Sequence, residues 1–225
     1  MSVSRREMLA FAAGLGLSSA WAAEPQWTEG KHYFRVPNPA PTQPGKVVIT
    51  EVFSYGCPAC NSFQPYMEAL EKRLPAGVTL DYLPASWIPA ENWPLFQRAY
   101  LTAKALGVAK KAHSAMFVAI WHSGELGIID PRTNRPRNPL PSIEDVARFY
   151  ERTAGVQAKK FVDMAKSFSI STEMKRADAL IKAYMAESTP TLIVNGKYRL
   201  EPRLAGGGDE AVQLSLWLAQ RELKG

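Results

Sequence analysis

A change of pattern at a pair of cysteines constrains the fold of this chain more than any other feature of its sequence. The run from Lys46 to Phe53 is rich in β-branched residues and almost continuously apolar, which is typical of a strand buried on both faces of a sheet. Val78 to Leu83 has the composition of a second strand. Between them, beyond Cys57, apolar residues recur every three or four positions, at Phe63, Tyr66, Met67, Leu70 and Leu74. This spacing is that of an amphipathic helix, and the order predicts an α/β fold.

Helical spacing dominates the middle of the chain. After Trp87 no strand pattern is found before Thr191, and four segments carry apolar residues at helical intervals: residues 93–106, 110–121, 143–153 and 157–168. Ser142, followed by Asp145, predicts the N-cap of the third of these helices. The segment 124–141, rich in proline and arginine, is expected to be a solvated surface loop, with contact to a partner protein as the alternative.

Short strand patterns lie near both ends of the folded part. Residues 32–36 predict an edge strand, and prolines between Pro37 and Pro44 make the next segment an extended connector. Residues 191–194 and 197–200 predict a hairpin, because Asn195-Gly196 between them favours a type I′ turn. A last amphipathic helix follows three consecutive glycines, residues 206–208.

The two cysteines stand where the first buried strand gives way to the helix. If Cys57 is the N-cap, Pro58 takes the first helical position, where its fixed φ fits and its missing N–H costs nothing. The sulfur of Cys57 then faces free backbone N–H groups and the positive end of the helix dipole, which favour a thiolate. Cys60 lies about one turn further on, within reach for a small disulfide ring. This spacing therefore predicts a redox-active pair.

Three other interpretations of the pair remain open. A structural disulfide is possible, although so small a ring constrains little chain entropy. A zinc site would need about four ligands, and the three histidines show no ligand spacing beside the two cysteines, so no metal is expected. A cysteine hydrolase would need a histidine as its base and would leave the second cysteine unexplained.

Residues 1–22 have the features of a secretory signal. The segment has Arg5 and Arg6 near its start, an apolar run from Met8 to Leu17 and small residues before the expected cleavage after Ala22. The paired arginines also resemble a twin-arginine signal, so the route is left open between Sec and twin-arginine export. Removal of this segment lowers the net charge from +6 to +5. An exported protein enters an oxidising compartment, where paired thiols can form a disulfide.

Two segments together resemble the DsbA family of periplasmic thiol:disulfide oxidoreductases. They are the stretch from Glu51 to Cys60, EVFSYGCPAC, and the stretch from Ser188 to Tyr198, STPTLIVNGKY. The resemblance covers essentially the whole mature chain. It implies a thioredoxin-like fold with an inserted helical domain, in which residues 23–89 and 166–225 form the thioredoxin-like domain and residues 90–165 the insertion.

The resemblance also implies roles for individual residues. Cys57 matches the family's exposed nucleophile, and Cys60 matches its shielded resolving cysteine. Pro190 matches the family's cis-proline, so Thr189-Pro190 is expected to be a cis bond beside the active sulfur and to bind substrate. X-Pro is the one type of bond in which the cis form is cheap. Glu51 matches a buried acid that helps to move the proton of the resolving cysteine.

Three features depart from the family's pattern. Ala59 stands where the best-known oxidases of the family carry histidine, so we expect a less depressed Cys57 pKa and a less oxidising disulfide. Gly56 replaces a bulky residue that is common there. The proline-rich segment 124–141 is longer than usual, which leaves partner contacts near it open.

The predicted function is introduction of disulfide bonds into reduced, unfolded exported proteins in the periplasm. The resemblance implies reoxidation by a quinone-linked membrane partner of the DsbB type, a monomer and no cofactor. Basic residues are scattered rather than gathered with aromatic ones, so no nucleic-acid partner is expected. One alternative is a reductase or isomerase of the same fold kept in the dithiol state, although residues 23–45 are too short for the dimerisation domain of such isomerases. Another is a non-catalytic binder of unfolded peptides.

Overall fold

The predicted strand–helix–strand unit forms one side of a mixed five-stranded sheet. The computed structural model describes residues 26–39 and 43–224. Strands β2 and β3 are parallel neighbours, and the remaining pairs are antiparallel in the order β1-β7-β6-β2-β3. The strands span Phe34–Arg35 (β1), Val47–Phe53 (β2), Val78–Pro84 (β3), Thr191–Val194 (β6) and Tyr198–Leu200 (β7). The predicted edge strand and C-terminal hairpin are thus confirmed.

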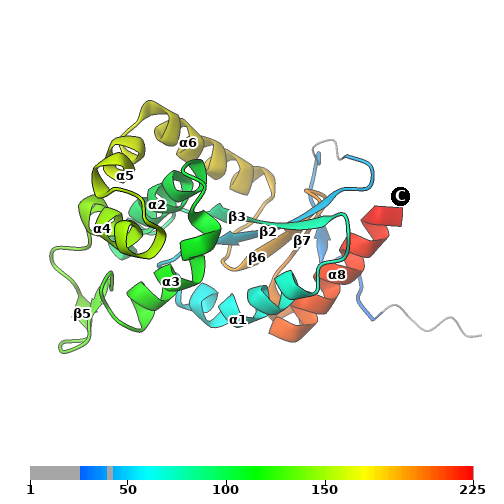
Figure 1. Cartoon of the computed structure of the whole chain (residues 1–225). Helices are drawn as coiled ribbons and strands as arrows, with labels where there is room; N and C mark the ends of the chain where they lie inside the picture. Colours follow the sequence, from blue (N-terminus) through cyan, green and yellow to red (C-terminus); the bar gives the residue numbers. More distant parts are fainter. Residues whose placement is uncertain (1–25, 40–42, 225) are drawn as a thin grey trace, which may run out of the picture.

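Helices cover the two faces of this sheet unequally. Helix α1 (Pro58–Lys72) and helix α8 (Gly208–Lys224) pack side by side on one face (Figure 1). Helix α6 (Phe168–Ala183) lies over the other face and contacts β3. The short helix α7 (Pro202–Ala205) leads from β7 into α8. These helices thus cover the sheet on both sides, and its interior strand β2 ends shortly before the cysteine pair.

The other helices gather at one end of the sheet, beyond the carboxyl end of β2 (Figure 1). The predicted helices appear there with small shifts at their ends, except the last. The pattern over 157–168 predicted one helix, but it ends at Ala165, and a new helix starts because the Ser167 hydroxyl caps it by accepting from the N–H of Ile170. The elements are a 3₁₀ turn η1 (Pro89–Glu91), α2 (Trp93–Ala105), α3 (Ala109–Trp121), α4 (Ile143–Ala154) and α5 (Ala158–Ala165).

Segment 124–141 lies largely at the surface, as predicted, but part of it forms regular structure. It contains a two-stranded hairpin of β4 (Ile129–Asp130) and β5 (Arg135–Pro136). Asn134, in the turn, has a φ of 52°, which asparagine tolerates better than most residues. The Arg137 guanidinium donates to the carbonyl of Gly124 at 2.8 Å and ties the ends of the segment together. The segment shows no apolar periodicity, and its structure is held by backbone hydrogen bonds between β4 and β5 and by the hydrogen bond from Arg137 to Gly124.

Two local predictions from turn and capping chemistry are confirmed. Asn195 and Gly196 both have positive φ, as a type I′ turn requires. Ser142 and Asp145 form a reciprocal capping box, with the Ser142 hydroxyl accepting from the N–H of Asp145 and the Asp145 carboxylate accepting from the N–H of Ser142. Asp145, whose side chain is one carbon shorter than the glutamate common at this position, is thus long enough to complete the capping box.

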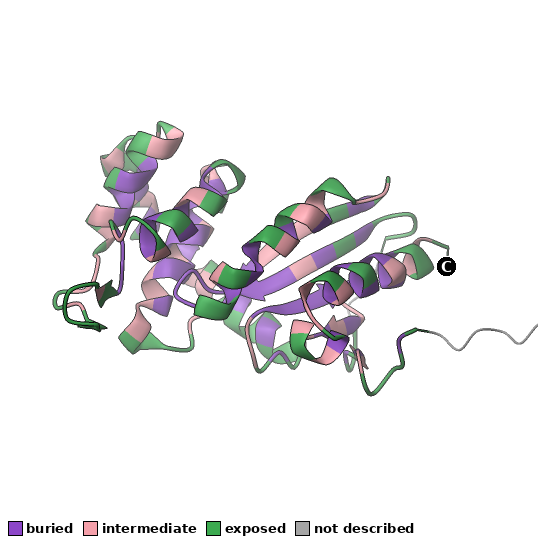
Figure 2. Ribbon diagram, turned by 90° about the horizontal axis from the view of Figure 1, so that it is seen from below, coloured by how far each residue is buried: buried purple, intermediate pink, exposed green. Residues whose placement is uncertain are grey.

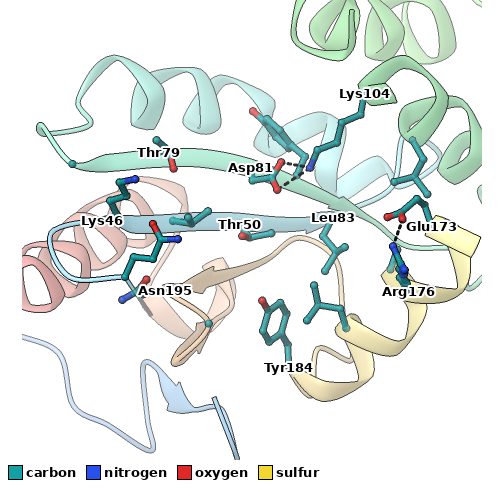
Figure 3. A pocket seen from close by; sticks show the side chains of 18 residues that line it. Lys46, Thr50, Thr79, Asp81, Leu83, Lys104, Glu173, Arg176, Tyr184 and Asn195 are labelled. Atoms are coloured by element: carbon teal, nitrogen blue, oxygen red, sulfur yellow. Dashed lines mark hydrogen bonds and ion pairs between the residues drawn. The ribbon is translucent and has the colours of Figure 1, made fainter. Parts of the chain in front are cut away.

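Strand β2 is buried on both faces only in its carboxyl half. Val52 and Phe53 are fully buried, whereas Val48 is 38% exposed, because α6 does not extend over the amino half of the strand. A groove of about 770 Å³ remains there between β2, β3 and α6. Figure 3 shows this groove, with Lys104 paired to Asp81 at one side. The prediction of a doubly covered strand is wrong for this half.

Buried side chains form two apolar clusters. Figure 2 shows in purple the buried residues along the strands and helices. One cluster lies between the sheet, α1 and α8. The other contains both cysteines and Val52 together with residues of the helical block, including Phe96 and Met116. The cysteine pair therefore sits where the sheet meets the helical block.

The predicted signal segment, residues 1–22, lies outside the described residues. Within residues 26–39 and 43–224, no helix combines the length and the apolar character that crossing a bilayer requires.

Candidate active site

Cys57 is the N-cap of α1, as its position before Pro58 predicted. Its φ of −88° and ψ of 119° are extended, and Pro58 takes the first turn of the helix. The sulfur accepts a hydrogen bond from the backbone N–H of Cys60 at 3.4 Å. A side-chain acceptor at this position satisfies one of the N–H groups that a helix leaves free at its start.

These hydrogen bonds make Cys57 an acidic thiol. Donation by the Cys60 thiol, with the backbone N–H groups of Cys60 and Ala59, lowers the pKa of Cys57 from 9.0 to about 6, although burial acts in the opposite direction. At neutral pH the sulfur is therefore mainly a thiolate, the form that acts as nucleophile and leaving group.

Cys60 has the opposite acidity. Its side chain is fully buried on the inner side of α1, and both thiols are free in the structure. Burial raises its pKa well above 9.0, and the hydrogen bond to Cys57 and the negative charge of Glu51 act in the same direction. Cys60 thus holds its proton under the conditions in which Cys57 loses one.

Glu51 lies in β2 beneath the pair, as predicted, and is 1% exposed. Burial raises the pKa of its carboxyl group well above 4.5, and the negative charge on Cys57 adds to this. Its Oε2 atom has no hydrogen-bond partner among the described residues. A buried carboxyl group without a countercharge favours its neutral form, so Glu51 can carry a proton close to the thiols.

The segment before β6 meets the sulfur of Cys57. The Thr189-Pro190 peptide bond is cis, as predicted, and the Thr189 carbonyl oxygen lies 3.6 Å from the Cys57 sulfur. The hydroxyl of Thr191 donates to the carbonyl of Ser188 at 2.8 Å and fixes the turn. The structure therefore brings together all five residues singled out from the sequence: Cys57, Cys60, Glu51, Thr189 and Pro190.

The residue before the first cysteine has a packing role that sequence reasoning missed. A Cβ atom on Gly56 would lie 2.7 Å from the Trp93 ring and 2.8 Å from the carbonyl oxygen of Glu91. Trp93 is buried, stacks on the half-exposed Trp87 and donates from its indole N–H to the Glu91 carboxylate at 3.0 Å. Gly56 thus gives an indole ring room beside the redox pair, in the place where the family commonly has a bulky side chain.

His113 and Tyr82 were also missed. His113 is 5% exposed, and only one of its two ring nitrogens has a hydrogen-bond partner among the described residues. Its Nδ1 shares a hydrogen bond of 2.9 Å with the Tyr55 hydroxyl, while Nε2 has no partner among the described residues. No local spacing connects it to the cysteines, because α3 reaches Tyr55 only through the packing of the helical block.

The groove of about 770 Å³ in Figure 3 is not the reactive site. Its lining residues come from β2, β3, α2, α6 and the turns near Gln43, Gly77 and Asn195, and none of the five predicted site residues lies among them. The dithiol is on the other side of the carboxyl end of β2, at the start of α1.

An acidic thiol at a helix start, a buried partner thiol and a cis-proline turn on a central sheet define a dithiol oxidoreductase of thioredoxin-like fold. Comparison with known proteins supports this class. A family model described as Thioredoxin matches residues 43–207. A crystal structure of Pseudomonas aeruginosa DsbA is 33% identical and superposes with a TM-score of 0.72, covering 88% of this chain and 95% of that one. The oxidoreductase DsbA of Xylella fastidiosa gives a TM-score of 0.76 at 28% identity, covering 89% of this chain and 100% of that one.

Sequence relatives identify the family. The thiol:disulfide interchange protein DsbA of P. aeruginosa is 34% identical over 216 residues, which cover 96% of this chain and 93% of that protein. The DsbA of Azotobacter vinelandii is 32% identical over 194 residues, which cover 86% of this chain and 83% of that protein. The chain belongs to the DsbA family of thiol:disulfide oxidoreductases, and it has the thioredoxin-like fold with a helical insertion.

Proposed function

We propose that this protein is a periplasmic oxidase that passes a Cys57–Cys60 disulfide to reduced exported proteins. The observation that carries the proposal is the opposite acidity of the two thiols. A thiolate stabilised at Cys57 favours the reduced form of the protein, and a stabilised reduced form makes its disulfide a stronger oxidant. Electrons therefore pass from substrate thiols to the dithiol site.

The reaction balances in two exchanges. A substrate thiolate attacks the sulfur of Cys57, an S–S bond forms to the substrate, and the bond to Cys60 breaks. The electron pair goes to Cys60, which takes up a proton because its buried thiolate is unfavourable. A second substrate thiolate then attacks the substrate sulfur of the mixed disulfide. Cys57 leaves as a stable thiolate, the substrate has lost two electrons, and the site has gained them.

Glu51 is proposed as the group that supplies and removes the proton of Cys60. It is buried beneath the dithiol, and its carboxyl oxygen Oε2 has no other partner among the described residues. Its raised pKa keeps a proton available when Cys60 becomes a thiolate. The same group accepts that proton when the dithiol is oxidised again.

Thr189 and Pro190 are proposed to hold the substrate chain beside Cys57. A proline at the start of a strand has no N–H, so the neighbouring backbone groups are left to pair with an extended peptide. The 3.6 Å separation between the Thr189 carbonyl oxygen and the Cys57 sulfur supports this role, because a peptide bound there would present its own cysteine to Cys57.

The setting of the reaction is proposed from the sequence and the family. Residues 1–22 would direct export and be removed after Ala22, and a quinone-linked membrane protein of the DsbB type would reoxidise the dithiol. We propose a monomer made of a thioredoxin-like domain, residues 23–89 and 166–225, and an inserted helical domain, residues 90–165. The gathering of α2 to α5 at one end of the sheet supports this division.

Two single-cysteine variants test the mechanism. We expect the oxidised parent to introduce disulfides into a reduced, unfolded protein and Cys57→Ser to have no such activity. Cys60→Ser should instead accumulate a mixed disulfide when it is given the same protein in its disulfide-bonded form: the Cys57 thiolate attacks the substrate disulfide, one substrate sulfur leaves as a thiolate, and no neighbouring thiol displaces the adduct. The measurement is the loss of substrate thiols together with mass spectrometry of trapped adducts. Activity in Cys57→Ser, or adducts on Cys60 rather than Cys57, would contradict the assignment.

A reductase or isomerase held in the dithiol form is the alternative, and Ala59 is the observation that favours it. The side chain at this position is a methyl group, so it adds neither charge nor a donor to the thiolate. The disulfide is then less oxidising than one with histidine there. Trapping the cysteines with an alkylating agent in intact cells separates the two functions: a mainly disulfide form supports the oxidase, and a mainly dithiol form the alternative.

A further inference from the structure

The hairpin of β4 and β5 carries two arginine side chains that bind nothing else in the described part of the chain. Residues 131–136 are all exposed. The side chain of Arg132 is 89% exposed, and its Nε lies 3.7 Å from the Asp130 carboxylate, too far for a hydrogen bond. Arg135 is exposed and has no ion pair among the described residues. Two guanidinium groups, each with five N–H donors, therefore face solvent without an acceptor from the protein.

A hollow of about 380 Å³ is formed by the hairpin and the residues that follow it. Arg132 and Arg137 both line it, together with Asp130. The N–H of Arg132 and the charges of the two arginines lower the pKa of Asp130, so its carboxylate stays ionised and offsets only one of the two positive charges. The hollow keeps a net positive charge. A guanidinium can bind an added carboxylate there through two parallel hydrogen bonds.

The segment that contains the hairpin is held close to the active site by a contact at each end. Just before it, the indole N–H of Trp121, the last residue of α3, donates to the carbonyl of Tyr55 at 2.8 Å, two residues before Cys57. At its other end, the Pro141 carbonyl accepts from the amide of Asn92 at 2.9 Å. Asn92 precedes α2, whose first indole packs beside the glycine before the dithiol. The base of the hairpin is thus tied to the backbone that positions the nucleophile, and the hairpin projects beyond the end of α3 (Figure 1).

The hairpin keeps its shape without the two exposed arginine side chains. The backbone N–H groups of Asn134 and Arg137 donate to carbonyls at and just before β4, at 2.8 and 2.9 Å. The Arg137 guanidinium also has a structural role, through its bond to the carbonyl at the start of the segment. Arg132 and Arg135 are therefore available to a ligand on a backbone that is already ordered, which lowers the entropy cost of binding.

Two kinds of anionic partner could bind exposed arginines: a lipid surface and an acidic polypeptide. Proteins that bind a lipid surface commonly place aromatic or other large apolar side chains among the headgroups. Residues 130–137, DPRTNRPR, include no such side chain, and Ile129 at the base of the hairpin is 39% exposed. The exchange reaction, in contrast, requires a polypeptide at Cys57. These observations favour the acidic polypeptide.

We infer that the hairpin binds acidic side chains of the polypeptide that is oxidised at Cys57, so that substrates with aspartate or glutamate near the reacting cysteine are preferred. Arg132 and Arg135 make the contact, and the hollow lined by Arg132 and Arg137 accepts one carboxylate. The inference rests on the proposed oxidase function and adds the class of substrate that it favours. Charges at the rim of an interface act mainly on the rate of encounter, so the preference lies in the second-order rate constant and leaves the equilibrium potential unchanged.

The test uses the oxidised full mature chain and three reduced peptides. Each peptide has the same pair of cysteines, and the flanking residues are acidic, uncharged or basic. We expect the acidic peptide to be oxidised about threefold to tenfold faster than the uncharged one, as one or two exposed ion pairs would give. The preference should disappear at high salt, since the Debye length falls from about 10 Å at 0.1 M to about 3 Å at 1 M. Moving the acidic pair along the peptide locates the hairpin relative to Cys57.

Paired variants assign the preference to the hairpin. Arg132→Gln with Arg135→Gln should lower the rate for the acidic peptide to that for the uncharged one, and Arg132→Glu with Arg135→Glu should make the basic peptide the faster substrate. The matched control is Lys160→Gln with Lys175→Gln, which removes the same charge from exposed positions on α5 and α6 and should keep the preference. Circular dichroism and the equilibrium potential show that the fold and the dithiol are unchanged.

Several outcomes would overturn the inference. They are equal rates for the acidic and uncharged peptides in the parent, a preference that survives in the glutamine variant of the hairpin, and a preference that is lost in the lysine control. Sedimentation with phosphatidylglycerol vesicles tests the lipid alternative: binding that the hairpin variant loses, with no difference among peptides, would make the hairpin a membrane contact instead. A parent that oxidises none of the three peptides would refute the proposed function itself.

Discussion

The two sulfurs of the active site differ in acidity although both are nearly inaccessible. Cys57 is 5% exposed and Cys60 is not exposed at all, yet the pKa of the first is lowered and that of the second is raised. Exposure therefore does not separate them. Cys57 accepts hydrogen bonds from the start of α1, which offset its burial, whereas Cys60 lies one turn along the helix, where burial raises its pKa.

This contrast shows what a single helical turn can do. The free N–H groups of a helix are confined to its first turn, so a side chain at the N-cap meets them and one three positions later does not. The same four-residue motif thus contains a stable anion and a stable thiol. Each of the following predictions concerns the Cys57 thiolate or its surroundings and leaves the Cys60 thiol unchanged.

The largest effect is expected in the difference in unfolding free energy between the reduced and the oxidised protein, which should change with pH. The Cys57 pKa is about 6 in the folded dithiol protein and 9.0 for the ordinary group. A lowered pKa stabilises the reduced fold fully above pH 9, and this stabilisation is lost as the pH falls to about 6. Three pKa units correspond to about 4 kcal/mol over the whole range, and about 1.4 kcal/mol of this is present near pH 7.

Urea unfolding of both redox forms at several pH values measures this difference. Groups present in both forms, including His113, largely cancel in the comparison. The raised pKa of Cys60 contributes in the opposite direction, but only above pH 9.0, so it does not act between pH 6 and pH 9. The negative charge on Cys57 raises the Glu51 pKa further in the dithiol form, which opposes part of the Cys57 effect. A difference that stays constant across this window would show that Cys57 is an ordinary thiol.

A smaller effect is expected from Gly56→Ala, which crowds the Cys57 side only. The new Cβ would meet the Trp93 ring and the backbone carbonyl of Glu91 at 2.7–2.8 Å, and backbone cannot move aside cheaply. Overpacking of this kind costs about 1–3 kcal/mol of unfolding free energy. Thermal and urea unfolding measure the loss. The substitution should not change the protonation of Cys60, so alkylation of Cys60 at neutral pH should stay slow. An unfolding free energy equal to that of the parent would contradict the close packing around Gly56.

The smallest effect is expected from Ala59→His. A histidine at this exposed position adds positive charge and a donor near the Cys57 sulfur, so the Cys57 pKa should fall and the disulfide should become more oxidising. A change of one pKa unit, about 1.4 kcal/mol, corresponds to about 30 mV for a two-electron couple, and we expect a shift of that size or less. Equilibration against glutathione buffers gives the potential, with Ala59→Gln as the uncharged control. A shift toward a less oxidising disulfide would refute the electrostatic explanation.

The sequence predicted those parts of the site that depend on neighbours in the chain. Cys57 and Pro58 are the N-cap and first residue of a helix, and Ser142 and Asn195-Gly196 fix a cap and a turn, through interactions within a few residues. The place of the Thr189-Pro190 bond beside the sulfur came instead from the resemblance to a family, because 132 residues separate Thr189 from Cys57.

What the sequence did not reveal depends on contacts between distant segments. Gly56 makes room for an indole from α2, and His113 lies on Tyr82 only because α3 packs against the sheet edge. The hairpin of β4 and β5 has strands of two residues, too short for any periodicity to show. The open groove beside β2 arises because α6 covers only part of the strand. The sequence of β2 itself does not indicate how far this distant helix extends.

The apolar cluster that encloses both cysteines also extends deep into the helical block. The sheet and the helical block do not have separate hydrophobic cores here. Val52 and Ile193 of the sheet belong to the same buried cluster as Phe96 and Met116 of the helices. Heating should accordingly melt sheet and helical block in one cooperative transition. A destabilising substitution in the helical block, far from the cysteines, should then also lower the redox activity, because the same apolar cluster surrounds the two sulfurs and the helices.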